Sequence, residues 1–112
     1  MPTTPDQLNE LIRRVAAADR VAFSGLYSAT SAKLYGIVLR IVKRRDLADE
    51  VLQETYIRIW NNARSFDPTR AAAITWMATI ARNRAVDEVR KVRPVALDDD
   101  GGVDEIEDPA ML

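Results

Sequence analysis

The stretch from Asp46 to Trp60 reads DLADEVLQETYIRIW, and it decides the class of fold. It contains neither glycine nor proline, and its apolar side chains recur at the three- and four-residue spacing of an α-helix. We therefore predict a helix from Leu47 to about Ala63, with Asp46 as its N-cap. The core candidates of this helix are Val51, Leu52, Thr55, Ile59 and, at the edge of the stripe, Tyr56.

Helical patterns also precede this stretch. Thr4 and Gln7 have the spacing of a capping box, which predicts a first helix that ends at about Ala18. Asp19 is the expected N-cap of a second helix, which runs from Arg20 to about Lys43. The predicted core positions of these two helices are Leu8, Leu11, Ile12, Val15, Phe23, Leu26, Tyr27, Leu34, Ile37, Val38, Ile41 and Val42.

After the central stretch, residues 65–70 are typical of a loop, because Asp67 favours turns and Pro68 restricts the residue before it. A further helix should begin near Ala71 and end near Val92, two residues before Pro94. Its core candidates are Ile74, Met77, Ile80, Ala81, Val86 and Val89. The whole pattern predicts an all-α domain, a compact bundle of three to four principal helices over residues 1–94, followed by a flexible acidic tail over residues 95–112.

Composition narrows the classes of function. The 112 residues suffice for one domain, and they include no cysteine and no histidine. The usual zinc ligands, the Ser-His and Cys-His nucleophile systems and the commonest general base are therefore absent. We expect a protein that is not an enzyme and that uses no cofactor and no metal. No stretch suggests a signal peptide or a membrane span, so we expect a cytoplasmic protein.

The net charge of −1 hides a strong asymmetry along the chain. All 16 lysines and arginines lie between Arg13 and Arg93, whereas seven of the 17 acidic residues lie between Asp98 and Asp108. The body of the chain therefore carries +6 and the tail −7. A basic body with an acidic tail is typical of a nucleic-acid-facing surface beside a solvated segment.

Several motifs occur in a fixed order: the acidic helix with Gln53-Glu54 and Trp60, then Phe66-Asp67, then Trp76, then Ala81-Arg82-Asn83. An aspartate, Asp87, follows shortly before a basic cluster. This order resembles region two of the extracytoplasmic-function (ECF) sigma factors, a branch of the bacterial sigma-70 family, over roughly residues 8 to 93. The resemblance implies a transcription initiation subunit that binds core RNA polymerase and recognises and helps melt the minus-ten promoter element.

The resemblance also implies which residues carry these roles. The acidic helix would contact the clamp helices of the largest polymerase subunit, and the expected contact residues are Asp49, Glu50, Gln53, Glu54, Tyr56 and Trp60. The last helix and the loop before it would bind promoter DNA, because Arg and Asn can read base edges while other cations bind phosphates. The expected DNA-binding residues are Arg64, Ser65, Phe66, Asp67, Thr69, Arg70, Trp76, Arg82, Asn83, Arg84, Asp87, Arg90 and Lys91.

Some alternatives stay open. Tyr56, Trp60, Phe66 and Trp76 could equally be core residues, and the acidic face could be merely solvated. We expect the second promoter-reading domain that is usual in ECF sigma factors to lie outside residues 1–112. An anti-sigma factor is an expected further partner, and binding such a regulator is the alternative main function. A metal-dependent enzyme built on Asp46, Asp49, Glu50 and Glu54 is a weaker rival, because one helix spreads these side chains over several faces.

Overall fold

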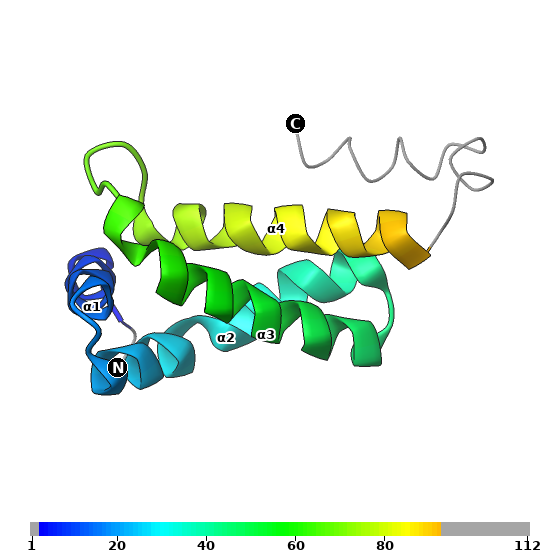
Figure 1. Ribbon diagram of the computed structural model, residues 1–112, viewed down its shortest axis with the longest axis horizontal. Helices are drawn as coiled ribbons and strands as arrows, with labels where there is room; N and C mark the ends of the chain where they lie inside the picture. The colour runs from blue at the N-terminus through cyan, green and yellow to red at the C-terminus, as the bar shows by residue number, and fades with distance from the viewer. Residues whose placement is uncertain (1–2, 93–112) are drawn as a thin grey trace.

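The computed structural model describes residues 3–92, and α-helices account for most of them (Figure 1). The elements in chain order are α1 (Pro5–Ala16), α2 (Arg20–Val42), α3 (Arg45–Asn62), the 3₁₀ helix η1 (Ala63–Ser65) and α4 (Ala73–Val92). The described range contains no strand, so the all-α prediction is confirmed. The acidic tail predicted over residues 95–112 lies outside the described residues.

Three of the helices lie side by side and the first crosses one end of them. In Figure 1, α2, α3 and α4 run along the long direction of the molecule, and α1 lies across the end where η1 and the following loop are found. Both α2 and η1 pack against α1, and α2 also packs against α3 and α4. The helices α3 and α4 also pack against each other and against α1, so all four helices share one core, and the loop before α4 lies beside α1.

The core is built on the apolar stripes that the sequence predicts, and several predicted positions are only partly buried: Leu11, Phe23, Ile37, Ile41, Ile74, Ile80 and Val86. Leu26 and Leu34 of α2, Ile59 of α3 and Met77 of α4 are completely buried. Burying an aliphatic side chain of this size contributes about 2 kcal/mol each. Leu8, Ile12 and Val15 of α1 are buried too, so α1 belongs to the same core.

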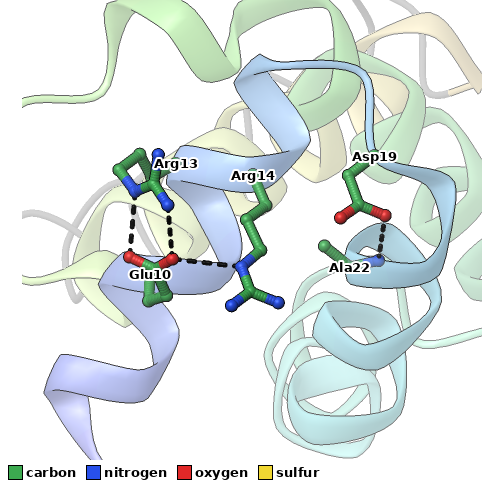
Figure 2. A network of polar contacts seen from close by, with 5 residues as sticks. All are labelled: Glu10, Arg13, Arg14, Asp19 and Ala22. Atoms are coloured by element: carbon green, nitrogen blue, oxygen red, sulfur yellow. Dashed lines mark hydrogen bonds and ion pairs between the residues drawn. The ribbon is translucent and has the colours of Figure 1, made fainter.

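Two predicted helix starts are confirmed. The Thr4 hydroxyl accepts a hydrogen bond from the Gln7 amide at 3.1 Å, and the Gln7 side chain accepts one from the Thr4 amide at 2.9 Å. Figure 2 shows the second start, where the Asp19 carboxylate accepts a hydrogen bond of 3.0 Å from the Ala22 amide. Each cap satisfies backbone donors that the first turn of a helix leaves without partners.

The predicted start of α3 was wrong. Lys43 takes the left-handed conformation (φ 62°) and ends α2, and Arg44 is extended, so α3 already begins at Arg45. Asp46 therefore lies inside the first turn instead of at the N-cap, and its carboxylate pairs with Arg44 at 2.8 Å. Hydrogen bonding to Arg44 lowers the pKa of Asp46, which keeps the side chain negative near the positive end of the helix.

Smaller differences concern two other helix ends. The first helix ends at Ala16, because Ala18 adopts a left-handed backbone (φ 66°) that cannot continue the helix. The last helix begins at Ala73 and not near Ala71, because the amides of Arg70 and Ala71 donate to the Asp67 carbonyl in a turn. The second helix ends at Val42, one residue before the predicted end.

The predicted core was wrong at Tyr27, whose side chain stays 45% exposed. Its ring lies tilted against that of Tyr56, with 4.7 Å between the centroids. Within residues 3–92, no helix has the length and apolar character needed to cross a membrane.

Candidate functional site

The exposed face of α3 is acidic and has an apolar residue at its centre. Glu50 and Gln53 are exposed, as are the flanking residues Asp49 and Glu54. Ile57 lies three, four and seven residues after Glu54, Gln53 and Glu50, so all of these side chains share one helix face. Ile57 is 58% exposed, and it was not among the predicted contact residues.

One edge of this face adjoins an aromatic cluster shared with α2. The ring of Phe23 packs edge-on against those of Trp60 and Tyr56, at centroid distances of 5.1 and 6.2 Å. Trp60 is partly buried, whereas Tyr56 is buried and its hydroxyl lies 2.5 Å from that of Thr30. Burial raises the pKa of Tyr56 to about 12, so the phenol stays protonated. Tyr56 thus has the environment of a core residue.

The opposite edge adjoins α4. A groove of about 530 Å³ separates the two helices there, and its walls are Glu54, Ile57, Arg58, Arg84, Asp87 and Lys91. Three of the residues predicted to bind DNA, Arg84, Asp87 and Lys91, therefore lie beside the face predicted to bind polymerase. Asn83 and Arg90 are exposed four residues before and three residues after Asp87, so they lie on the same side of α4 as Asp87, whereas Arg82 is only partly exposed.

Arg84 differs from the other cations of α4 because its side chain is only 9% exposed. It forms ion pairs with Glu88, one turn further along α4, and with Glu54 of α3. Burial alone would lower the pKa of Arg84, but the hydrogen bond to Glu88 and the charge of Glu54 raise it overall. The sequence indicates a solvated cation at this position, and the structure has a buried one.

The loop between η1 and α4 has a defined shape. The Asp67 carboxylate accepts hydrogen bonds from the Thr69 amide at 2.9 Å and from the Thr69 hydroxyl at 2.6 Å. These bonds lower the pKa of Asp67 and keep it ionised. The Ser65 hydroxyl donates to the Asn62 carbonyl at 2.8 Å, while Arg64 and Arg70 are exposed. Three of the predicted loop contacts therefore also hold the loop in place.

Phe66 anchors this loop to α4. Its ring lies 5.1 Å from that of Trp76, centroid to centroid, and both side chains are partly buried in the core. Trp76 stands in the first turn of α4, where its amide donates to the Ala72 carbonyl at 3.0 Å. The pair joins the loop to the helix that follows it.

A hollow of about 560 Å³ lies between this loop and α1. Arg64, Phe66 and Pro68 form the loop side, and the α1 side includes Asn9, whose buried side-chain oxygen has no hydrogen-bond partner within the described residues. Arg13 also lines the hollow, but its guanidinium is held by Glu10 at 2.6 Å, as Figure 2 shows. The side chain of Arg14 binds the same carboxylate, and both arginines lower the pKa of Glu10 to about 2.

The four carboxylates of the weaker enzyme hypothesis do not converge. Within residues 3–92, no group of three or more histidine, cysteine, aspartate or glutamate side chains is placed to hold a metal ion. What the described surface offers is an acidic face with an apolar centre on α3, exposed polar and basic side chains on α4, and a loop with a hollow behind it.

The order of the motifs and their placement on α3, the loop and α4 agree with a family of known proteins. Residues 26–94 match the family model described as Sigma-70 region 2. This chain belongs to the sigma-70 region 2 family. The sigma factor family is non-enzymatic, and the resemblance predicted from the sequence is confirmed.

The relatives of this region 2 domain are ECF sigma factors. It is 39% identical over 89 residues to the "ECF RNA polymerase sigma factor SigK" of Mycobacterium tuberculosis, an alignment that covers 80% of this chain and 48% of the relative. The protein of the same name from Mycolicibacterium vanbaalenii is 37% identical over 90 residues, which cover 80% of this chain and 46% of the relative. The chain thus spans about half the length of the curated relatives that it matches.

Two features of the region 2 surface escaped the sequence prediction. Ile57 could have been found from the sequence. It lies outside the core stripe of its helix, and an apolar residue on a polar helix face indicates a contact surface. The contribution of α1 to the hollow could not, because nothing in residues 5–16 indicates that they pack beside a loop some fifty residues later.

Proposed function

We propose that this chain acts in transcription initiation, binding the clamp helices of core RNA polymerase through α3 and the minus-ten promoter element through α4 and the loop before it. The observation that carries the proposal is the exposed face of α3, where acidic and amide side chains lie beside the exposed Ile57. Stable protein interfaces combine an apolar centre with a polar rim, and charge complementarity gives them orientation.

This face has the composition that a basic partner requires. Within the described residues, the side chains of Asp49, Glu50 and Gln53 make no hydrogen bond or ion pair with the rest of the domain, so their charges and amide are available to a partner. Carboxylates pair well with the guanidinium groups of a partner helix. An apolar side chain between them excludes water from these pairs.

Replacing Ile57 by serine should weaken binding to core polymerase about tenfold, since loss of a central apolar contact costs more than 1 kcal/mol in a typical interface. The free energy of unfolding should change by less than about 0.5 kcal/mol, because the side chain is exposed. Affinity for purified core polymerase and urea unfolding measure the two effects. Val21→Ser is the matched control, because Val21 is 82% exposed on α2.

Equal affinities of Ile57→Ser and the unsubstituted chain would contradict the α3 interface. If the unsubstituted chain itself bound no polymerase, the proposed function would fail and the alternative, a module that binds an anti-sigma regulator, would take its place. These two outcomes can be told apart, because equal affinities can be measured only if the unsubstituted chain binds polymerase.

Support for the DNA-binding half comes from α4. Asn83 and Arg90 are separated by seven residues and are exposed on one face together with Thr79. An asparagine amide can donate to and accept from one base edge, whereas a flexible cation binds phosphate without reading sequence. The hollow beside the loop offers room for an unpaired base, which favours melting when such a site is filled.

Asn83→Ala should reduce the preference for the correct minus-ten sequence about tenfold, because one specific pair of hydrogen bonds to a base contributes roughly 1–3 kcal/mol of discrimination. Nonspecific binding should change little. Competition between matched and mismatched single strands, bound to the complex with polymerase, measures this ratio. Thr79→Ala, one turn earlier on the same exposed face, is the control and should keep the preference. An equal loss of affinity for all DNA sequences would show that Asn83 contacts the DNA sugar-phosphate backbone and not a base.

A further inference from the structure

Arg84 lies on the basic helix α4 but is too buried to contribute to the exposed basic surface of that helix. The side chain of Arg84 is 9% exposed, whereas Arg90 and Lys91 on the same helix are exposed. A phosphate contact needs an accessible guanidinium. The Nη2 donor of Arg84 is instead engaged by carboxylates of α3 and α4.

Two carboxylates from different helices share this guanidinium. Its Nη2 atom lies 2.9 Å from an oxygen of Glu88, and it also pairs with an oxygen of Glu54 across the groove. The Glu88 side chain is 8% exposed, and Lys91 approaches the same carboxylate at 4.0 Å. Glu88 is therefore satisfied within α4, and Arg84 is the link that extends from this pair to α3.

Glu54 is the member of the network that reaches the surface. Its side chain is 48% exposed, and it stands at the α4 edge of the acidic face. A free glutamate on a helix samples several rotamers, and a partner must fix one of them at an entropic cost. The ion pair with Arg84 holds Glu54 in one rotamer before any partner binds. It also sets how closely α3 and α4 approach.

We propose that Arg84 is a positioning residue for polymerase binding: it holds the Glu54 carboxylate at the edge of the acidic face and fixes α3 against α4, and it does not contact DNA. This inference rests on the proposed function of the α3 face. It assigns to the interior of the domain a residue of the basic helix that sequence reasoning places on the DNA.

The test uses the double variant Arg84→Met/Glu88→Leu. Removing Arg84 alone leaves the Glu88 charge buried beside Lys91 only, and the Tm should fall by at least about 12 °C. Replacing the buried pair by apolar side chains of similar length should restore most of that loss. In the refolded double variant, affinity for core polymerase should still be about fivefold lower, because Glu54 is no longer held.

A further substitution separates positioning from packing. In the unsubstituted background, Glu54→Gln should lower polymerase affinity about fivefold. In the Arg84→Met/Glu88→Leu background it should have almost no additional effect, because the contribution of Glu54 depends on Arg84. Equal effects of Glu54→Gln in both backgrounds, or full polymerase affinity in the double variant, would overturn the proposal.

The salt dependence of DNA binding tests whether Arg84 contacts a DNA phosphate. The slope of log affinity against log salt should be the same for the double variant as for the unsubstituted chain, whereas Arg90→Met should reduce it by about 0.7 to 0.9. A reduction of that size in the double variant would assign Arg84 to a phosphate. Absence of polymerase binding by the unsubstituted chain would refute the proposed function itself, and the role of Arg84 with it.

Discussion

Replacing Tyr56 by alanine should destabilise the domain by about 3–5 kcal/mol, the usual cost of removing a buried aromatic side chain. Three contacts are lost at once: the rings of Phe23 and Tyr27 and the hydroxyl of Thr30. Because domains of this size are only about 5–15 kcal/mol stable, much of the chain should unfold near body temperature. Thermal or urea unfolding measures the loss.

The matched variant Tyr56→Phe isolates the hydroxyl. The Thr30 hydroxyl already donates to the Leu26 carbonyl at 2.7 Å, so its oxygen accepts the proton of Tyr56. Loss of this bond should cost about 1 kcal/mol and leave polymerase affinity unchanged. If Tyr56→Phe instead bound polymerase tenfold more weakly at unchanged stability, the hydroxyl would be a contact with the partner.

Trp76→Ala should have the second large effect, because it should lower both the stability of the domain and its binding of the minus-ten single strand. Loss of a partly buried tryptophan should cost roughly 3 kcal/mol of stability. It also removes the ring against which Phe66 packs, so the loop loses its anchor on α4. Binding of a minus-ten single strand in the presence of polymerase should fall at least tenfold, because an unfixed loop must be ordered on binding.

Ile41→Ala provides the control for Trp76. Ile41 is partly buried near the end of α2 that is remote from the loop, so its loss should reduce stability without a specific effect on the single strand. Unchanged stability of Trp76→Ala combined with a large loss of DNA binding would show that the indole stacks on a base and does not anchor the loop.

The fold follows from the sequence wherever a helix has both an apolar stripe and a side-chain cap. Thr4 and Asp19 have carboxyl or hydroxyl oxygens at the right spacing, and both are the N-caps expected. The start of α3 was missed because it has no side-chain cap at all. A lysine in the left-handed conformation makes that turn, and no local preference of Lys43 predicts it.

The exposed residues of the candidate site could be predicted from the sequence, whereas its buried charged residues could not. Exposed residues such as Glu50 and Asn83 lie where the helical period places them. Arg84 and Glu88 could not be recognised as buried, because a charge run usually indicates a solvated face and their pairing depends on how α3 lies against α4. A change at Glu54 also removes a partner of Arg84, so its effect on the surface is interpretable only beside the same change in the Arg84→Met/Glu88→Leu background.

The crossing helix α1 also determines how short a folding unit can be. The family match begins at residue 26, inside α2, yet Leu8, Ile12 and Val15 of α1 are buried in the common core. A chain cut at the boundary of the match would expose the apolar surface of α2 that these side chains cover and would open one wall of the hollow beside the loop. The helical core is thus longer than the family match over residues 26–94, because it includes α1 with its Thr4 cap.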